Sequence, residues 1–158
     1  MNIAILCVGK LKEKFWQEAA AEYIKRLQRY MKLEVIEVPD LPEPANASDA
    51  DREQVKEKEG KALLAKIRPG DKVCAMCIEG PQLESPQLAK MMKADEETGA
   101  RRVYVIGGSL GLSADVLRRA DERLSMSKMT FPHALARVML LEQIYRGAKI
   151  DAGERYHK

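Results

Sequence analysis

A glycine-rich turn is the first segment of this chain whose composition suits ligand binding. It runs from Gly107 to Gly111, after an apolar stretch that ends at Ile106 and before a helical pattern that begins near Ser113. In α/β folds this position is the carboxyl edge of a strand, where ligands usually bind. The spacing fits neither the dinucleotide-binding Gly-x-Gly-x-x-Gly pattern nor the P-loop. The segment is therefore either a ligand-binding turn of another class or a tight turn in which glycine supplies positive φ.

A second candidate segment runs from Ser125 to His133 and combines hydroxyl, apolar and backbone amide groups. His133 is one of two histidines in the chain and directly precedes the last helical pattern. The positive end of a helix dipole favours the neutral form of such an imidazole. Because the segment follows another strand edge, it can share a pocket with the glycine turn. The alternative is a helix-entry loop with a capping histidine.

Cys74 and Cys77 have the Cys-x-x-Cys spacing of redox pairs and zinc sites. They lie in an apolar run that is typical of a strand, where positions three apart face opposite sides of the sheet. A redox pair needs a helix N-terminus to lower the thiol pKa, and zinc needs further ligands that the nearby sequence lacks. We therefore expect core cysteines and no metal. The odd total of 3 cysteines favours reduced thiols in a reducing compartment.

The elements that must position these segments follow from the periodicity of apolar residues. We expect strands at residues 2–8, 33–38, 73–78, 103–106 and 123–127. We expect helices at residues 15–31, 48–67, 85–97, 113–120 and 134–150, with Ser48, Ser85 and Ser113 as N-caps. This alternation predicts a single α/β domain over residues 1–158, with a parallel sheet that has helices on both faces.

Composition limits the class of protein. Hydrophobic residues make up 46% and charged residues 32% of the chain, which argues against disorder, collagen-like repeats and coiled coils. The apolar run at residues 3–8 is too short to span a bilayer and lacks the flanks of a secretion signal, so we expect a cytoplasmic protein without a membrane partner. The net charge is only +3, but basic residues crowd both ends of the chain. This crowding fits either solvated helix faces or a nucleic-acid-binding surface.

Several of these segments together resemble one known family. They are the opening Ile5-Leu-Cys-Val-Gly-Lys-Leu-Lys-Glu-Lys14, the turn Val105-Ile-Gly-Gly-Ser-Leu-Gly-Leu112, the loop from Ser125 to His133, Arg146 and the terminal Tyr156-His157-Lys158. In this order they resemble the bacterial ribosomal large subunit methyltransferase H family over essentially the whole chain. That family belongs to the SPOUT superfamily of S-adenosylmethionine-dependent methyltransferases. Its members methylate N3 of a pseudouridine in 23S ribosomal RNA.

The resemblance implies a trefoil knot near the C-terminus that holds the methyl donor. Carried over by position, it implies donor contacts from Met76, Gly108, Ser127, Lys128, Met129, Thr130, Phe131 and Pro132. It places His133, Arg146, Tyr156 and His157 around the substrate pocket, where they can position the base or move its proton. It also implies 23S ribosomal RNA, in the large subunit or the 70S ribosome, as the partner, and it requires no metal.

The residues alone leave two other functions open. One is a non-enzymatic, ribosome-associated RNA-binding protein that uses the basic ends, and the other is a thiol oxidoreductase built on Cys74 and Cys77. We also expect a homodimer, because the last helix is apolar on too many sides for a monomer. The tail from Gly153 to Lys158 is short and polar, as frayed termini are. Yet Tyr156 can stack on a base, so we expect the tail to fold over the donor pocket of a partner subunit.

Overall fold

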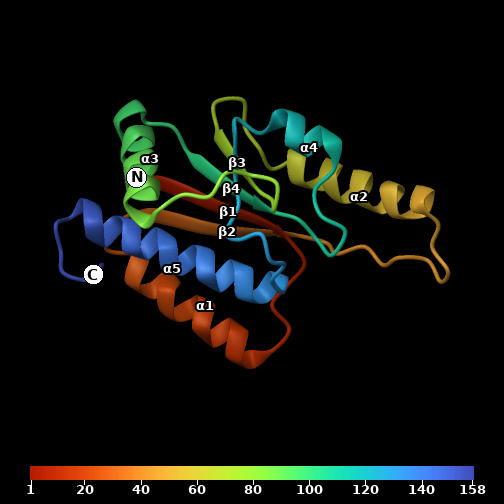
Figure 1. Cartoon of the computed structure of the whole chain (residues 1–158), viewed down its shortest axis with the longest axis horizontal. Coiled ribbons are helices and arrows are strands. Elements are labelled where there is room, and N and C mark those ends of the chain that lie inside the picture. Colours follow the sequence, from red (N-terminus) through yellow and green to blue (C-terminus); the bar gives the residue numbers. More distant parts are fainter.

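Five parallel strands form one sheet, in the order β2-β1-β4-β3-β5, in the computed structural model, which describes residues 1–158 (Figure 1). The strands are β1 (Asn2–Val8), β2 (Lys32–Val38), β3 (Lys72–Met76), β4 (Arg102–Ile106) and β5 (Glu122–Leu124). The helices are α1 (Lys14–Leu27), α2 (Asp49–Leu64), α3 (Ser85–Thr98), α4 (Ala114–Arg119) and α5 (His133–Asp151). The predicted α/β fold with a parallel sheet is confirmed. None of its helices combines the length and apolar composition needed to cross a membrane.

Successive residues of the central strands face two different helical layers, as the period of a strand requires. In β1, Ile3 and Ile5 belong to the core cluster that also holds residues of α1, α3 and α5. Ala4 and Leu6 belong to the second cluster, with residues of α2 and α4. Both faces of the sheet are therefore covered. This explains why the central strands are apolar throughout instead of alternating with polar residues.

Side-chain caps fix where two of the helices begin. The Ser48 hydroxyl accepts the Asp51 N–H, and the Asp51 carboxylate accepts the Ser48 N–H, which forms the capping box that starts α2. The Ser113 hydroxyl caps α4 by accepting the amide of the third helical residue. Both serines satisfy amide groups that would otherwise lack partners. These two predicted caps are confirmed.

Several predicted boundaries differ from the structure, and β3 and α2 end two and three residues earlier than predicted, at Met76 and Leu64. Helix α3 is capped by Glu84 rather than Ser85, because the side chain of Glu84 accepts the Gln87 N–H and the side chain of Gln87 accepts the Glu84 N–H. Helix α1 ends at Leu27, earlier than predicted, since the chain must turn there to enter β2. Strand β5 ends at Leu124, because the next amide leaves the sheet and donates to the Pro81 carbonyl.

The loop that follows β3 lies directly against the end of β5 and the chain that follows it. The Cys77 N–H donates to the Leu124 carbonyl at 3.0 Å, and the Ser125 N–H donates to the Pro81 carbonyl at 2.9 Å. Gly80 lies so close to this segment that a Cβ there would be 2.8 Å from the Leu124 amide nitrogen. Beyond the crossing the chain enters α5, which packs on the face of the sheet opposite to α4. The arrangement is consistent with the trefoil knot that the resemblance implies.

Helix α5 is buried on two sides within its own chain. It packs against both α1 and α3, in addition to the sheet. A Cβ at Gly147 of α5 would lie only 2.9 Å from the sulfur of Met92 in α3, so the two helices approach closely. Neighbours in the same chain therefore explain the apolar circumference of α5. The homodimer stays a prediction, and the apolar surface of α5 no longer argues for it.

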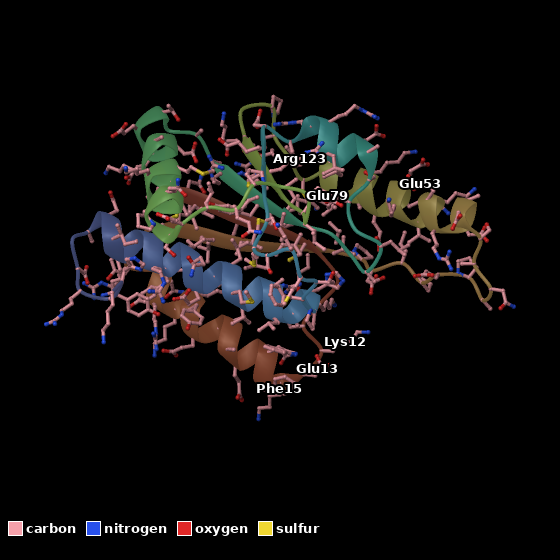
Figure 2. All side chains as sticks on the ribbon, in the orientation of Figure 1. Lys12, Glu13, Phe15, Glu53, Glu79 and Arg123 are labelled. Atoms are coloured by element: carbon pink, nitrogen blue, oxygen red, sulfur yellow. The ribbon has the colours of Figure 1, made fainter.

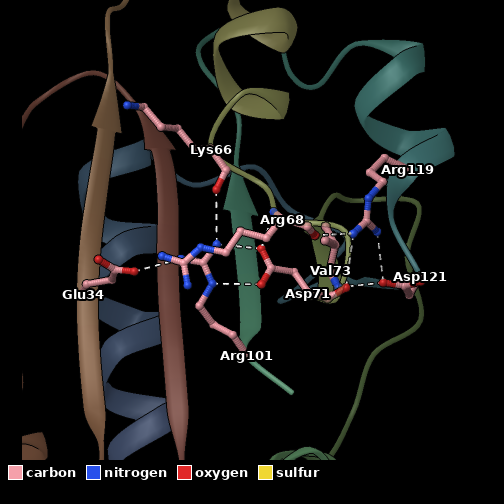
Figure 3. A network of polar contacts seen from close by, with 8 residues as sticks. All are labelled: Glu34, Lys66, Arg68, Asp71, Val73, Arg101, Arg119 and Asp121. Carbon is pink, nitrogen blue, oxygen red and sulfur yellow. Dashed lines mark hydrogen bonds and ion pairs between the residues drawn. The ribbon is translucent and has the colours of Figure 1, made fainter. Parts of the chain in front are cut away.

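Buried ion pairs close the amino edge of the sheet (Figure 3). Arg101 donates from Nε and Nη2 to the two carboxylate oxygens of Asp71, at 2.9 and 2.6 Å, and from Nη1 to Glu34 at 2.8 Å. Burial raises the pKa of Asp71, but hydrogen bonds from Arg101 and from the Arg68 N–H outweigh it and hold that pKa below its usual value. The network joins the beginnings of β2, β3 and β4. It therefore stabilises the edge opposite to the glycine turn and leaves the carboxyl edge free for binding.

Candidate functional site

A cavity of about 530 Å³ opens at the carboxyl edge of the sheet, where β3, β4 and β5 end. Its walls come from the loop after β3, the glycine turn after β4 and the loop between β5 and α5. The side chains and backbone that line it include Met76, Ile78, Glu79, Gly107, Gly108, Leu112, Arg123, Ser127, Met129, Thr130, Phe131 and His133. A mainly apolar lining with a few polar groups is typical of small-molecule sites, whose volumes are roughly 300–1,000 Å³.

The glycine turn forms one wall of this cavity and has a fixed shape. The Gly111 N–H donates to the Gly108 carbonyl at 3.0 Å, and Gly111 has φ +85°, a conformation that favours glycine. A Cβ at Gly107 would lie 2.8 Å from the carbonyl carbon of Gly111, so the turn closes only with glycine at that position. The turn is thus both a tight turn and a wall of a cavity, which unites the two alternatives that the sequence left open.

A buried carboxyl group lies behind this turn. Glu59 of α2 is 3% exposed, and a Cβ at Gly108 would lie 3.0 Å from its Oε1. The Leu41 N–H donates to Glu59 Oε2 at 3.1 Å. Burial raises the pKa of Glu59, and the neighbouring carboxyl of Asp40 acts in the same direction. Gly108 therefore makes room for a neighbour in the protein, in addition to any ligand on its other side.

Hydroxyl groups hold the loop between β5 and α5 in place. The buried Ser125 hydroxyl donates to the Ser127 carbonyl at 2.8 Å, and the Met129 N–H donates to the Ser127 hydroxyl at 3.0 Å. Met129 is 73% exposed, although its side chain lines the cavity. The loop thus presents an apolar side chain to solvent at the mouth of the cavity, which is the position where a ligand would cover it.

Most of the residues expected to hold the donor line this one cavity. Six of the eight do so: Met76, Gly108, Ser127, Met129, Thr130 and Phe131. The other two, Lys128 and Pro132, belong to the same loop, but their side chains are exposed and lie outside the lining. His133 also lines the cavity, at the first position of α5. The structure thereby brings the glycine turn and the last loop together, as their positions after strand ends suggested.

The other three expected catalytic residues, Arg146, Tyr156 and His157, lie together at the far end of α5. Arg146 is thirteen residues beyond His133 in the same helix, which corresponds to about 20 Å along its axis. Its Nη1 lies 3.3 Å from Nδ1 of His157, and its guanidinium carbon lies 4.8 Å from the centroid of the Tyr156 ring. Figure 1 shows the C-terminal tail at the end of α5 that is remote from the loop entering this helix. Within one chain, these residues form a cluster separate from the cavity.

The C-terminal tail is attached to the rest of the chain rather than frayed. The Tyr30 hydroxyl donates to the two carboxylate oxygens of Glu154, at 3.1 and 3.0 Å, and Lys149 forms an ion pair with the same carboxylate at 2.5 Å. The Tyr156 ring packs edge-on against Tyr145, with a centroid distance of 4.9 Å. Burial, and then the nearby Glu142 carboxylate, raises the pKa of Tyr156. Tyr156 therefore keeps its proton at neutral pH and is suited to donate or stack rather than to act as a base.

The sequence prediction missed three charged residues at the cavity. Glu79 and Arg123, labelled in Figure 2, line it from the loop after β3 and from β5, and Lys56 of α2 also lines it. The position of Glu79 directly after an apolar strand was a usable signal, because the carboxyl ends of parallel strands share one edge. The other two had no comparable signal, since they come from a helix and from within a strand.

The cysteines do not form a reactive pair. Burial raises the pKa of Cys74 to about 12. Burial, followed by the carboxylate of Glu79, also raises the pKa of Cys77. Both thiols are therefore protonated at neutral pH, whereas a redox pair needs a thiol whose pKa is lowered. Across the whole chain, no three His, Cys, Asp or Glu side chains are grouped so that they could hold a metal ion.

The chain is an α/β protein with a cavity at the carboxyl edge of its sheet, walled in part by the loop that enters its last helix. The model of the family described as "Predicted SPOUT methyltransferase" matches residues 1–157. The chain therefore belongs to the SPOUT methyltransferase family, whose members generally use S-adenosylmethionine as methyl donor.

Two solved structures whose names assign them provisionally to a methylase family share this fold. The protein from Haemophilus influenzae Rd KW20 is 12% identical, with a TM-score of 0.59, and the match covers 99% of this chain and 70% of that one. The protein from Neisseria gonorrhoeae is 14% identical, with a TM-score of 0.54, over 99% of this chain and 86% of the other. At these identities the likeness establishes the fold alone.

Proposed function

We propose that this protein methylates N3 of a pseudouridine in 23S ribosomal RNA, with S-adenosylmethionine as donor and the large subunit or the 70S ribosome in the cytoplasm as substrate. The observation that carries the proposal is the cavity in which the glycine turn meets the loop from Ser127 to Phe131, in a chain of the SPOUT family. The sequence segments that resemble the ribosomal large subunit methyltransferase H family provide these walls and the tail cluster.

The residues around the cavity fit a sulfonium nucleoside. Met76, Leu112 and Phe131 provide apolar wall for an adenine ring, and the turn provides backbone amides and carbonyls for polar groups. The Glu79 carboxylate on the rim is suited to a cationic ligand. When bound, S-adenosylmethionine supplies an electrophilic methyl group. The protein's task is to hold the target nitrogen in line with that methyl and to exclude water.

The target nitrogen belongs to an imide and must lose its proton as its bond to the methyl carbon forms and the carbon–sulfur bond breaks. Negative charge that develops on the two flanking carbonyl oxygens needs hydrogen-bond donors. His133 at the cavity mouth can accept the proton or donate to a carbonyl, and Arg146 provides a permanent cation. Tyr156, which keeps its proton, can stack on the base or donate to it.

The separation of the two groups of residues supports a homodimer. The cavity contains His133, whereas Arg146, Tyr156 and His157 lie about 20 Å away along α5 of the same chain. A two-fold arrangement that places the tail cluster of one subunit on the cavity of the other would complete two equivalent sites. Each site would then take its donor pocket from one chain and its tail residues from the other.

The test is transfer of tritium from labelled S-adenosylmethionine to ribosomes that lack the modification, followed by mapping of the labelled nucleotide. Label on N3 of one pseudouridine in 23S ribosomal RNA is the expected result. Label on another nucleotide would keep a methyltransferase and overturn the substrate. Binding of ribosomes without binding of S-adenosylmethionine, measured by calorimetry, would instead identify a non-enzymatic RNA-binding protein.

A further inference from the structure

A basic segment lies next to the candidate site and comprises the loop after β1 and the first residues of α1. We define the lysine arm as residues 9–16, Gly-Lys-Leu-Lys-Glu-Lys-Phe-Trp. Lys10, Lys12 and Lys14 are exposed, whereas Leu11 is half-buried and packs against the core cluster below it. The arm thus presents three positive charges within five residues while its inner side is held by the core.

Hydrogen bonds from two helices fix the backbone of the lysine arm. Arg137 of α5 donates to the Gly9 carbonyl at 3.0 Å and forms an ion pair with Glu37 of β2 at 2.6 Å. The side-chain amide of Gln17 donates to the Leu11 carbonyl at 2.7 Å. Arg137 is itself buried, so its position is set by the packing of α5. The lysines therefore extend from a rigid support, which reduces the entropy lost when they bind a partner.

The charges on the arm are largely unpaired within the protein. Lys10 and Lys12 form no ion pair in the structure, and Lys14 has only a 3.8 Å pair with the exposed Glu18. Such exposed pairs contribute little free energy and are readily exchanged. Glu13 is the single acidic residue in the arm. The lysine charges are available to a negatively charged partner.

An exposed aromatic ring completes this surface. Phe15 is 61% exposed, and its ring centroid lies 5.0 Å from that of Trp16, which is half-buried. Single exposed apolar side chains are common on protein surfaces, so the position of Phe15 beside the lysines is what gives it meaning here. A hollow of about 370 Å³, lined in part by Lys10 and Gln17, lies between the arm and the helices. The surface therefore combines cations, a free ring face and a recess.

The lysine arm and the cavity lie on the same edge of the sheet. Strands β1 and β4 are neighbours, and the arm follows one as the glycine turn follows the other. A Cβ at Gly108 in the turn would lie 3.2 Å from Cγ1 of Val8, the last residue before the arm. Ala136, which lines the cavity, directly precedes Arg137, which holds the arm. Figure 2 shows Lys12 near the end of α5 where that helix begins.

We propose that the lysine arm binds the RNA strand that flanks the target nucleotide, with its lysines on phosphates and Phe15 stacked on an unpaired base. The inference rests on the proposed function, because it takes RNA as the substrate. Cations that follow a phosphate backbone and an aromatic ring that accepts any base are the two features by which proteins bind single-stranded RNA. A single exposed ring offers too little apolar area for a stable protein interface, so the charges favour RNA as the partner.

The first experiment measures binding of a fluorescein-labelled RNA hairpin, with a pseudouridine in its loop, to the full chain over a range of salt concentrations. The triple variant Lys10→Ala/Lys12→Ala/Lys14→Ala should bind about tenfold more weakly, with a salt slope smaller by about 2, since each phosphate contact on a single strand contributes roughly 0.7 to the slope. The matched control Lys58→Ala/Lys61→Ala/Lys66→Ala removes three exposed lysines from α2 and the turn after it. Its affinity and slope should stay close to those of the wild type.

The second experiment separates the ring from the charges. Phe15→Leu keeps an apolar side chain and loses the aromatic face, whereas Phe15→Tyr keeps the face. We expect Phe15→Leu to weaken hairpin binding about fivefold at an unchanged salt slope, and Phe15→Tyr to bind like the wild type. Affinity for S-adenosylmethionine should be unchanged in every variant, which reports that the fold and the cavity are intact.

The outcomes distinguish this inference from the proposed function. If the wild type binds the hairpin and the arm variants bind it equally well with the same salt slope, the assignment of the arm is wrong while the substrate stands. If hairpin binding is unchanged but the triple variant loses affinity for ribosomes, the arm contacts a ribosomal protein and the RNA assignment is wrong. If the wild type binds neither hairpin nor ribosomes, both the inference and the RNA substrate are overturned.

Discussion

Arg146 and Tyr156 stack on each other, with the guanidinium carbon 4.8 Å from the ring centroid. The contact is made between the last turns of α5 and a tail that a sequence alone would class as frayed. It holds the phenol in place, together with the edge-on contact between the Tyr156 and Tyr145 rings. The tail therefore has a defined structure before any RNA arrives.

Deletion of residues 155–158 tests the role of this tail. The deletion leaves Glu154, whose contacts with Tyr30 and Lys149 should keep the new end attached. We expect methyl transfer to fall at least tenfold, about 1.4 kcal/mol of transition-state stabilisation, because the stacking and proton-transfer groups are gone. Single-turnover transfer to unmodified ribosomes measures the rate, with donor affinity and sedimentation as controls. A truncated enzyme with the full rate would remove Tyr156 and His157 from the site.

Substitution of a glycine tests the wall of the cavity. In Gly107→Ala the new Cβ would meet the Gly111 carbonyl group at 2.8 to 2.9 Å, so the turn has to open. We expect the affinity for S-adenosylmethionine to fall about tenfold or more. Gly70→Ala is the matched control, since a Cβ there meets nothing within 4 Å. Gly108→Val should also abolish donor binding, but it disturbs Glu59 as well. The result that would contradict the role of the turn most clearly is therefore an equal affinity of the wild type and Gly107→Ala for S-adenosylmethionine.

Removal of a thiol separates methyl transfer from thiol chemistry. Cys74 is fully buried and far from ionising, since burial raises its pKa to about 12. Cys74→Ala should keep the rate of methyl transfer and lower the free energy of unfolding by about 1 kcal/mol through the lost packing. Urea unfolding and the transfer assay measure the two effects. A specific loss of activity in a variant of unchanged stability would revive the oxidoreductase alternative.

Because of the ion pair between Arg101 and Asp71, we expect the free energy of unfolding to depend on pH. The pKa of Asp71 is lower in the folded protein than the usual aspartate value of about 4, so the pair stabilises the fold fully above about pH 4. Its contribution is lost as the pH falls through the lower, folded value. Asp71→Asn should cost about 3 kcal/mol near neutral pH, because it leaves a buried guanidinium short of a partner. Urea unfolding should show this difference shrinking below about pH 4.

The exposed Glu57 provides the control for that experiment, since Glu57→Gln removes a carboxylate that makes no ion pair in the structure. Its effect on unfolding should stay within about 0.5 kcal/mol at every pH. A difference between wild type and Asp71→Asn that is independent of pH would show that packing, and not the charge of Asp71, accounts for the loss.

The periodicity of the sequence was sufficient to predict the order of strands and helices, because burial on both sheet faces makes the central strands nearly continuous apolar runs. It could not predict which strands are neighbours. The site residues that the sequence analysis missed depend on that strand order. Lys56 and Glu59 come from α2, and reach the glycine turn because α2 connects β2 to β3 across β1 and β4. The turn and the last loop were predictable for a different reason, since each directly follows a strand at its carboxyl end.

The separation of His133 from Arg146 was also not predicted from the sequence. Both belong to one helix, so their separation of about 20 Å follows from helix geometry once the helix is known to be continuous. The resemblance placed them in one pocket, which a single chain does not form. The sequence therefore provided His133 and Arg146 as candidates, whereas their separation within one chain emerged only from the fold.

Helix α5 separates the cavity from the cluster of Arg146, Tyr156 and His157. This separation predicts how mixtures of two inactive variants behave. If each site is formed by both chains as proposed, a chain with an altered glycine turn lacks a working donor pocket but keeps its tail. A chain without its tail keeps a working donor pocket. When the two are unfolded together and reassociated, each mixed dimer regains one intact site, so about a quarter of wild-type activity should return from two inactive proteins. Complementation of this kind would show that one subunit's defect can be masked by its partner, which no site contained in a single chain would allow.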